Sequence, residues 1–338
     1  MIVNNNEINV GVVGASGYTG LELVKILIKH PTFNLSYISN SEGGLMLSEL
    51  HPSLSGVYEC KVLKANIDEI TQECELVFLA LPHKTAMAYV KPLIAKGVKV
   101  VDLSADYRLP KDLYEEYYCS HTDVDNLKDA VYGLPELFRK ELKTTSLVAN
   151  PGCYPTSAIL GLLPFMDKRV PSTPIIIDAK TGVSGAGKKL NEEIHFVNIH
   201  ENMFSYNPLI HRHAPEIAQK LKVDFDEVNF VPHLVPITRG MMSSIYIQVS
   251  DDFNAFEVLS NFYKDEVHVR VSKNPVDMKN VAGTNFCDIY VKQKGNTLFI
   301  SSAIDNLMRG ASSQAVVNAN IMMGIDEALG IPCIAYVP

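Results

Sequence analysis

The chain has 338 residues, of which 47% are hydrophobic and 20% are charged, and its formal net charge is -8. This length suits two domains of ordinary size, and the composition is typical of a globular protein. Nucleic-acid-binding proteins are normally basic, so we expect no nucleic-acid partner. The longest apolar run, near Leu76–Leu81, suits a buried strand and is too short to span a membrane, so we expect no membrane partner.

The N-terminal sequence and the cysteines indicate a cytoplasmic protein. No basic region followed by an apolar stretch and a small-residue cleavage site precedes the first expected strand, which argues against export. None of the six cysteines forms a C-x-x-C pair, so neither a disulfide framework nor a zinc site is predicted.

The first half of the chain alternates between apolar runs that suit strands and amphipathic stretches that suit helices. In chain order the expected elements are a strand at Ile8–Val13, a helix at Glu22–His30, strands at Leu35–Ile38 and Leu76–Leu81, a helix at Thr85–Lys96, and strands at Val98–Leu103 and Leu147–Ala149. Such alternation predicts a mostly parallel sheet with helices on both faces.

After Pro155 strands predominate. The expected elements are a helix at Thr156–Met166, strands at Ile175–Asp178, Val228–Val231, Ile245–Val249 and Leu298–Ile304, and a helical stretch at Ala311–Ala328. This pattern predicts a mixed, largely antiparallel sheet. The fold class is therefore α/β. We predict a Rossmann-like dinucleotide-binding domain over residues 1–150, joined by a C-terminal helix within 311–338, and an α+β domain over residues 151–310.

Glycines dominate the segment between the first expected strand and helix, which reads Gly11-Val12-Val13-Gly14-Ala15-Ser16-Gly17-Tyr18-Thr19-Gly20. Glycine lets the backbone approach a pyrophosphate closely, and the following helix N-terminus offers N–H groups to it. The spacing is G-x-x-G-x-x-G, so the strand–turn–helix context carries the argument. We predict a dinucleotide site with contacts from Gly14, Ser16, Gly17, Tyr18 and Thr19. The alternative is a glycine turn required only for packing.

The end of the second expected strand bears on the choice between NAD and NADP. NAD enzymes usually place an acidic residue there, whereas this region reads Ser36-Tyr37-Ile38-Ser39-Asn40-Ser41 and reaches Glu42 only afterwards. Hydroxyl and amide groups accommodate a 2′-phosphate that a carboxylate would repel. We therefore predict NADP, with Ser39 among its contacts. If Glu42 points inward, the preference reverses.

The segment Asn150-Pro151-Gly152-Cys153-Tyr154-Pro155-Thr156 indicates a nucleophile. Cys153 follows a Pro-Gly turn and precedes an expected helix, whose dipole stabilises a thiolate. A thiolate can attack an activated acyl carbon, and the resulting thioester can accept a hydride. We predict that Cys153 is a covalent nucleophile. The alternative is a buried spacer, the commoner role of a lone cysteine.

A nucleophile of this kind needs a proton-handling group, and Leu209-Ile210-His211-Arg212-His213-Ala214-Pro215-Glu216 contains two histidines at alternate positions. In extended chain, His211 and His213 face the same way, and Glu216 could orient one of them. The alternatives are a polar surface loop and a zinc site. No third metal ligand lies at a telling distance, so no metal is predicted.

Two further segments suit anions. The first, Lys180-Thr181-Gly182-Val183-Ser184-Gly185-Ala186-Gly187-Lys188, offers backbone amides and hydroxyls but lacks the spacing of a P-loop. The second ends in Ile237-Thr238-Arg239-Gly240, where Arg239 could bind a substrate carboxylate with two N–H groups. A solvated arginine at a strand end is the alternative.

Taken in order, these segments resemble the N-acetyl-gamma-glutamyl-phosphate reductase family. The resemblance also includes Ser104-Ala105-Asp106-Tyr107-Arg108-Leu109, Tyr132-Gly133-Leu134-Pro135-Glu136, and Asp305-Asn306-Leu307 with Gly310-Ala311, and it spans nearly the whole chain. The cysteine and double-histidine segments are specific to that family. The glycine turn is shared with the wider semialdehyde dehydrogenase group.

The resemblance implies NADPH-dependent reduction of N-acetyl-L-glutamyl 5-phosphate to N-acetyl-L-glutamate 5-semialdehyde, a step of arginine biosynthesis. It implies a thioester on Cys153, acid/base catalysis by His211 or His213 with His211 favoured, and a catalytic and dimerisation role for residues 151–310 in a homodimer or homotetramer. The expected substrate contacts are Asn150, Ser184, Arg108, His213 and Arg239; Ser184, Gly185 and Asn306 are further cofactor contacts. The arginine often found near Ser39 in the family is absent here, and residues 306–310 match in outline only.

Three other interpretations remain. Aspartate-semialdehyde dehydrogenase uses the same chemistry, but in that family a histidine follows a late arginine, whereas Arg239 precedes Gly240-Met241-Met242. A reductase of carrier-linked glutamyl phosphate differs only in the amine substituent of the acyl group. An NADP-binding redox sensor would use Cys153 as an oxidisable switch, although it would need neither anion segments nor paired histidines.

Overall fold

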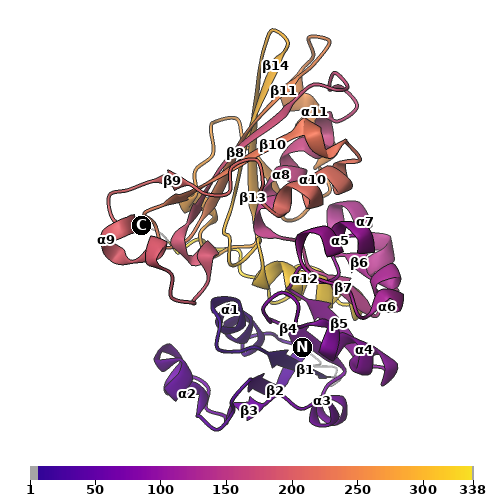
Figure 1. Ribbon diagram of the computed structural model, residues 1–338, viewed down its shortest axis with the longest axis vertical. Helices are drawn as coiled ribbons and strands as arrows, with labels where there is room; N and C mark the ends of the chain where they lie inside the picture. Colours follow the sequence, from indigo (N-terminus) through magenta and orange to yellow (C-terminus); the bar gives the residue numbers. More distant parts are fainter. Residues whose placement is uncertain (1–6, 337–338) are drawn as a thin grey trace, which may run out of the picture. The chain divides into compact units, whose positions relative to one another are not determined.

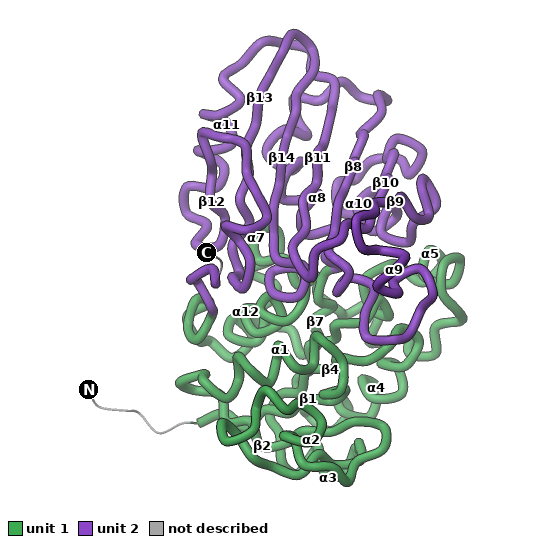
Figure 2. Tube along the Cα trace, turned by 90° about the vertical axis from the view of Figure 1, so that its left-hand side faces the viewer, with its two compact units in different colours: residues 1–151, 311–331 green, residues 152–310, 332–338 purple. Residues whose placement is uncertain are grey.

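The computed structural model describes residues 7–336. Contacts divide this part of the chain into two compact units (Figure 2). Unit 1 contains the residues up to Pro151 together with Ala311–Ile331, and unit 2 contains Gly152–Gly310 together with the residues from Pro332 onward. The prediction placed all of 311–338 with the first domain, whereas the residues from Pro332 onward belong to unit 2. There the Pro332 carbonyl accepts the N–H of Asn285.

Unit 1 is built on a parallel sheet of seven strands (Figure 1). They are β1 (Ile8–Val13), β2 (Phe33–Asn40), β3 (Leu63–Lys64), β4 (Leu76–Leu79), β5 (Lys99–Asp102), β6 (Val131–Tyr132) and β7 (Leu147–Ala149). Their order is β3-β2-β1-β4-β5-β7-β6, and every neighbouring pair is parallel. The strand order reverses beside β1, and sheets of this type bind ligands at the carboxyl ends of the strands near such a reversal.

Helices cover both faces of this sheet. They are α1 (Tyr18–Leu27), α2 (Leu47–Leu50), α3 (Ile67–Glu73), α4 (Met87–Ala95), α5 (Lys111–Tyr117), α6 (Val124–Asp129), α7 (Pro135–Leu142) and α12 (Ser312–Met322). Helices α1 and α12 contact each other, as do α3 and α4. Helix α1 connects β1 to β2, and α3 connects β3 to β4 in the opposite direction across the sheet, so right-handed crossovers place the two pairs on opposite faces. All four residues of β4 are therefore buried, as its uninterrupted apolar sequence predicts.

Unit 2 is built on a mixed sheet, also of seven strands. They are β8 (Ile175–Gly182), β9 (Phe204–Ser205), β10 (Val228–Val235), β11 (Met241–Gln248), β12 (Val269–Val271), β13 (Cys287–Lys294) and β14 (Thr297–Ile304). Their order is β12-β13-β14-β11-β8-β10-β9. The pairs β8–β10 and β12–β13 are parallel, and the other four are antiparallel. The predicted combination of a Rossmann-like domain and a largely antiparallel domain is confirmed.

Three helices of unit 2, α8 (Cys153–Leu162), α10 (His213–Leu221) and α11 (Ala255–Phe262), lie on one face of its sheet (Figure 1). The short helix α9 (Phe196–Ile199) lies apart from them. Helix α8 packs on β11 and β14, α11 packs on β13, and α10 packs on α8 and β10. Alternate residues of β11 are buried toward these helices. On the opposite face Ile176 and Tyr246 are 46% and 40% exposed, so this face is open in unit 2.

Two of the differences between the predicted and the observed elements have a clear physical reason. The last helix was expected to extend to Ala328, but α12 ends at Met322 and a turn at Gly324, with φ of +70°, follows it. Strand β13 was not predicted because charged residues interrupt its apolar pattern. One of them, Asp288, is held by an ion pair of 2.6 Å with Arg270 on the neighbouring β12.

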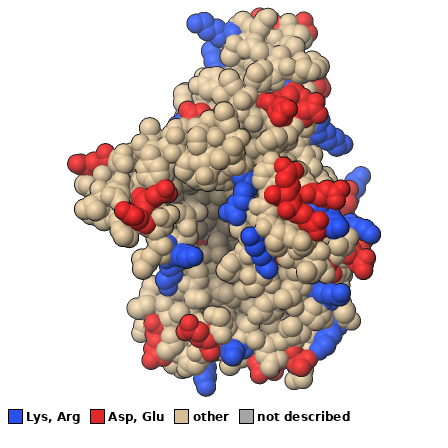
Figure 3. Space-filling view, viewed as in Figure 1, with Lys and Arg blue, Asp and Glu red and all other residues tan. Residues whose placement is uncertain are grey.

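The face drawn in Figure 3 carries acidic and basic side chains in scattered small groups, with no continuous basic area. Within residues 7–336, no helix has both the length and the apolar character needed to cross a bilayer.

Candidate active site

The glycine turn of unit 1 has the close backbone packing that a pyrophosphate cradle requires. Gly14 has φ of +94°, and a Cβ there would lie 2.3 Å from the Ala80 carbonyl oxygen. A Cβ at Gly20 would lie 2.4 Å from the Gly14 oxygen. Gly17 is the N-cap of α1 and has no side chain with which to cap it. The first turn of α1 therefore presents backbone N–H groups that can donate hydrogen bonds to an anion. A dinucleotide pyrophosphate is such an anion.

The end of β2 lies beside this turn. The Ser39 carbonyl accepts the N–H groups of Gly14 and Ala15 at 2.9 and 3.0 Å. The next residue, Asn40, uses its side-chain oxygen to accept the N–H of Glu42 at 3.0 Å, and Glu42 itself is exposed. The strand thus ends in an amide side chain, and the next acidic residue along the chain, Glu42, belongs to the exposed turn that follows.

Arg108 and Asn150, both predicted substrate contacts, are buried in unit 1 and tied to its backbone. The Arg108 side chain donates to the carbonyls of Asn150 and Leu103 at 2.7 and 2.8 Å. The Asn150 amide donates to the Ala311 carbonyl at 3.1 Å and accepts from Asn318 at 3.0 Å. These contacts connect the carboxyl end of β7 to helix α12.

The loop that carries Arg108 starts at a buried carboxyl group, Asp102. This side chain accepts the N–H and the hydroxyl of Ser104 at 2.9 and 2.7 Å. Burial, together with the neighbouring charge of Asp106, raises the pKa of Asp102 to about 7. The folded protein therefore holds a proton on Asp102 between about pH 4 and 7, where the unfolded chain has lost it.

We expect this difference to make wild-type stability fall as pH rises from about 4 to 7. Above pH 7 the ionised Asp102 costs about 4 kcal/mol, the free-energy equivalent of its pKa shift. Asp102→Asn should remove this cost. The free energy of unfolding in urea should therefore increase for the variant, relative to the wild type, between pH 5 and pH 8. A difference between the two proteins that does not change with pH would contradict this assignment.

Helix α8 carries Cys153 as its first residue. The preceding Gly152 has extended backbone, with φ of -67° and ψ of 152°, so Cys153 lies in the turn that carries the positive end of the helix dipole. Every later residue of α8 is buried, whereas Cys153 is only partly buried. Small residues let the helix pack closely on the sheet, since a Cβ at Gly161 would lie 3.1 Å from the Ile245 side chain. Cys153 is thus accessible on a rigid support.

Two contacts fix the backbone around Cys153. The carboxylate of Glu216, on α10, is 1% exposed and accepts the Gly152 N–H at 3.0 Å. On the other side, a Cβ at Gly310 would lie 2.7 Å from the Cys153 Cβ, so only glycine allows this approach. Glu216 was expected to orient a histidine. The contact found is with the cysteine turn, and the role toward a histidine stays a prediction.

The two histidines lie together at the start of α10. Their ring centroids are 4.8 Å apart, and the backbone N–H of His213 donates to His211 Nδ1 at 3.1 Å. Neutral His211 therefore carries its proton on Nε2. Burial, together with the positive charge of Arg212, lowers the pKa of His211 to about 4. His211 is thus a neutral N–H donor at physiological pH.

Two tyrosines connect the cysteine turn to the histidines. The ring of Tyr154, which follows Cys153, lies 5.8 Å from each histidine ring. Its hydroxyl is 2.9 Å from that of Tyr206, whose ring lies 5.6 Å from His211. Burial raises the pKa of both hydroxyls, so both stay protonated. Neither tyrosine was predicted, and for Tyr206 no sequence motif could have indicated it.

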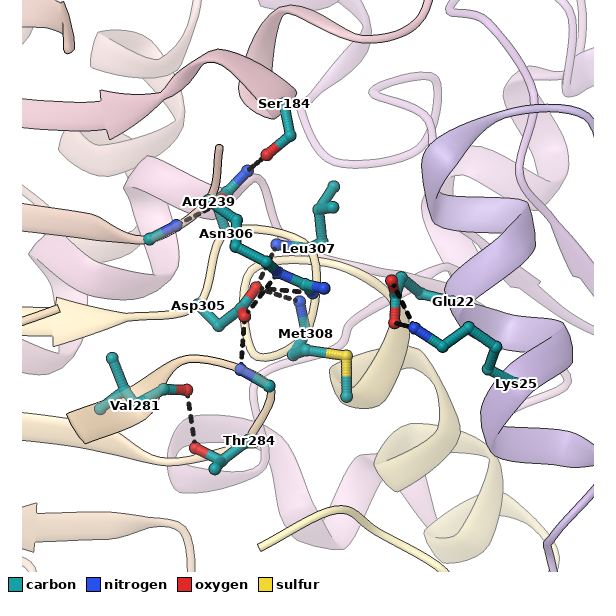
Figure 4. A network of polar contacts seen from close by, with 12 residues as sticks. Glu22, Lys25, Ser184, Arg239, Val281, Thr284, Asp305, Asn306, Leu307 and Met308 are labelled. Atoms are coloured by element: carbon teal, nitrogen blue, oxygen red, sulfur yellow. Dashed lines mark hydrogen bonds and ion pairs between the residues drawn. The ribbon is translucent and has the colours of Figure 1, made fainter. Parts of the chain in front are cut away.

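A second polar network in unit 2 holds Asn306 (Figure 4). Its amide nitrogen donates to the Ser184 hydroxyl at 3.0 Å, and its side-chain oxygen accepts the Gly240 N–H at 2.8 Å. Gly185 fits against Thr181, since a Cβ there would lie 3.1 Å from the threonine hydroxyl. The expected cofactor contacts Ser184, Gly185 and Asn306 are therefore close neighbours.

Arg239 belongs to the same network. Its Nε lies 2.8 Å from Asp305 Oδ2, and its Nη2 donates to Asp305 Oδ1 at 3.1 Å (Figure 4). Asp305 is completely buried. The arginine thus neutralises a carboxylate of the protein itself, and its predicted role as a substrate clamp stays a prediction.

The predicted residues divide between the two units. Unit 1 contains Gly14, Ser16, Gly17, Tyr18, Thr19, Ser39, Arg108 and Asn150; unit 2 contains Cys153, Ser184, Gly185, His211, His213, Glu216, Arg239 and Asn306. Within residues 7–336, no group of three or more His, Cys, Asp or Glu side chains is arranged to hold a metal ion.

Both units match known families. Residues 9–145 match the family described as semialdehyde dehydrogenase, NAD binding domain, and residues 153–306 match semialdehyde dehydrogenase, dimerisation domain. Unit 1 is therefore a nicotinamide-dinucleotide-binding domain. Among solved structures, aspartate semialdehyde dehydrogenase II from Vibrio cholerae has a TM-score of 0.71 and 16% identity over 95% of this chain and 99% of that one. At that identity the likeness shows the fold alone.

Sequence relatives distinguish among the members of this fold. A protein of Sulfurimonas denitrificans named N-acetyl-gamma-glutamyl-phosphate reductase is 78% identical over 98% of this chain and 100% of its own length. A protein of the same name from Methanocaldococcus jannaschii is 44% identical over 95% of this chain and 97% of its own. The chain therefore belongs to the N-acetyl-gamma-glutamyl-phosphate reductase family, a group of oxidoreductases of the semialdehyde dehydrogenase type.

Proposed function

We propose that this protein reduces N-acetyl-L-glutamyl 5-phosphate to N-acetyl-L-glutamate 5-semialdehyde with NADPH, in arginine biosynthesis. The proposal rests on Cys153, a partly exposed thiol at the first position of α8, next to Gly310 and in a turn held by Glu216. The 78% identity to a protein named for this reaction supports the choice of substrate.

The chemistry begins with the sulfur of Cys153. Sulfur bonds to the acyl carbon, the bond from that carbon to the phosphate oxygen breaks, and phosphate leaves with the electron pair. The dinucleotide, when bound, supplies the hydride that reduces the thioester. The oxygen that becomes negative when the hydride adds takes a proton from an acid. The carbon–sulfur bond then breaks, the sulfur keeps its electron pair, and the hydroxyl proton returns to that group, now a base, as the aldehyde forms.

The two histidines suit different tasks. His211 is neutral, its Nδ1 already accepts the His213 N–H, and only its Nε2–H is left to donate. Such a neutral donor suits the oxyanion that forms at the acyl carbon. We therefore assign proton transfer to His213, in place of the preference for His211 drawn from the family resemblance.

The end of β2 supports NADP over NAD. Ser39 and Asn40 are buried there, and Glu42 lies in the exposed turn beyond them, so no carboxylate ends the strand to repel a 2′-phosphate. A solved aspartate semialdehyde dehydrogenase from Candida albicans, with the same fold and a TM-score of 0.71, was crystallised with NADP.

The open face of the unit 2 sheet supports self-association. It presents Ile176 and Tyr246, and the ring of Phe299 lies 5.2 Å from that of Tyr246. Exposed apolar sheet faces are usually covered by a partner, and the matched family description names dimerisation. A homodimer through this face, or a homotetramer that contains it, follows.

The reverse reaction tests the proposed function. We expect reduction of NADP by N-acetyl-L-glutamate 5-semialdehyde that requires inorganic phosphate, with a much lower kcat/KM for NAD. Reactions without phosphate, and with L-aspartate 4-semialdehyde in place of the substrate, are the controls. Cofactor binding without turnover would indicate a sensor and contradict the proposal, as would a preference for the aspartate compound.

A further inference from the structure

The C-terminal segment Pro332–Tyr336 returns to unit 2 and binds beside the buried Asp305. We propose that this segment is a strap that holds the loop 305–310 in its reactive geometry, with Tyr336 as a positioning residue that acts through Arg239 and Gly283. The inference rests on the proposed function, because that function places Asn306 and Gly310 of this loop beside the reacting groups.

Asp305 organises the loop. One carboxylate oxygen accepts the N–H groups of Leu307 and Met308 at 2.9 and 3.1 Å, and the other accepts the Gly283 N–H at 2.7 Å (Figure 4). Arg239 supplies the compensating positive charge. A fully buried carboxylate needs both its hydrogen bonds and its counter-charge, so loss of either destabilises the loop.

The loop in turn carries two groups of the site. Asn306 connects to Ser184 and to the Gly240 backbone. Gly310 lies against Cys153, where a Cβ would come within 2.7 Å of the cysteine Cβ. A shift of the loop would therefore change the surroundings of the Cys153 sulfur.

Tyr336 covers both groups that hold Asp305. Its ring lies 5.8 Å from the Arg239 guanidinium, within the range of a cation–π contact. It also lies on the backbone of Gly283, where a Cβ would come within 2.3 Å of the tyrosine ring. Gly283 therefore has to be glycine for two reasons, the ring above it and its own φ of +80°.

Backbone hydrogen bonds at Pro332 and at Tyr336 anchor the two ends of the strap. The Tyr336 N–H donates to Ala282 at 3.3 Å, and the Pro332 carbonyl accepts from Asn285 at 3.1 Å. The turn between them is closed by Thr284, whose hydroxyl donates to Val281 at 2.9 Å. The strap and this turn thus form one unit beside the ion pair.

The exposure of Tyr336 separates positioning from general stability. Tyr336 is 59% exposed, so removal of its ring leaves no cavity in the core. What changes is the access of water and salt to the pair of Arg239 and Asp305, and ions screen an exposed pair far more than a covered one. Salt dependence is therefore the signature of this role.

Hydrogen exchange provides a test that does not depend on turnover. In Tyr336→Ala, the amides of Leu307, Met308 and Gly283 are expected to exchange about 3- to 30-fold faster, the range set by loss of one cation–π contact. Tyr336→Phe keeps the ring and should match the wild type, as should Ile334→Ala, which removes a side chain of the strap that is 83% exposed. Unchanged exchange in Tyr336→Ala would overturn the proposal.

Kinetics provide the second readout. We expect kcat of Tyr336→Ala to fall about 3- to 30-fold, and to fall further between 0.05 and 0.5 M NaCl relative to the wild type, with KM for the acyl phosphate little changed. Tyr336→Phe should restore both. Faster exchange with kcat unchanged would limit the strap to local stability and overturn its positioning role. An inactive wild type would refute the proposed function. The hydrogen-exchange result would still show whether Tyr336 stabilises the loop 305–310.

Discussion

Replacement of Cys153 by serine is expected to lower kcat by at least about 10⁴-fold, because the reaction loses its covalent nucleophile. Serine has nearly the same size but does not ionise at neutral pH, so the first bond to the acyl carbon forms far more slowly. Binding of the dinucleotide to unit 1 should be unchanged, and a fluorescence titration with NADPH checks this.

The covalent intermediate can be observed directly. Wild-type protein mixed with the acyl phosphate, without NADPH, should gain the mass of one acyl group, and proteolysis should place that group on the peptide that contains Cys153. Cys60→Ser is the matched control, since Cys60 is also a partly buried thiol but does not begin a helix. Acylation that persists in Cys153→Ser, or its loss in Cys60→Ser, would exclude Cys153 as the nucleophile.

Replacement of the two histidines by asparagine is expected to give different defects. His213→Asn should lower kcat by about 10²- to 10⁴-fold, the usual contribution of an acid/base group. His211→Asn should cost about 10²- to 10³-fold, as loss of one oxyanion donor does. Added imidazole should partly restore His213→Asn, because it can replace a missing base, but should not restore a missing fixed donor.

The pH dependence separates the two roles further. Because burial keeps the pKa of His211 at about 4, His211 stays neutral across the assay range. Any inflection of kcat/KM between pH 5.5 and 8.5 should therefore persist in His211→Asn. Imidazole rescue of His211→Asn, or disappearance of the inflection in that variant, would reverse the assignment of the two residues.

Much of the fold could be predicted from local sequence. The uninterrupted apolar residues of β4 indicated a strand covered on both faces, and the alternation along β11 indicated a sheet with one covered face. Strand β13 escaped prediction because Asp288 breaks its pattern. Its charge is compensated by Arg270, a residue on another strand, and local sequence does not reveal such a pairing.

The site was predictable where a motif sits at the end of a helix. Gly152 and Cys153 begin α8, so the relation between turn and sulfur is local. Glu216 was identified from its distance to the histidines, yet its contact is with the Gly152 N–H, which lies 64 residues away. Tyr206 had no signal at all, because its role arises only where its hydroxyl meets that of Tyr154.

Local sequence was enough to predict the two kinds of sheet, the glycine turn before α1 and the candidate nucleophile at the start of α8. Each of these depends on residues a few positions apart, whose side-chain size and backbone freedom act locally. Folding is what brings Arg239 to Asp305, removes water from around His211, and places the Tyr336 ring beside the Arg239 guanidinium. Burial and charge compensation depend on which distant segments pack together, and no single segment contains that information.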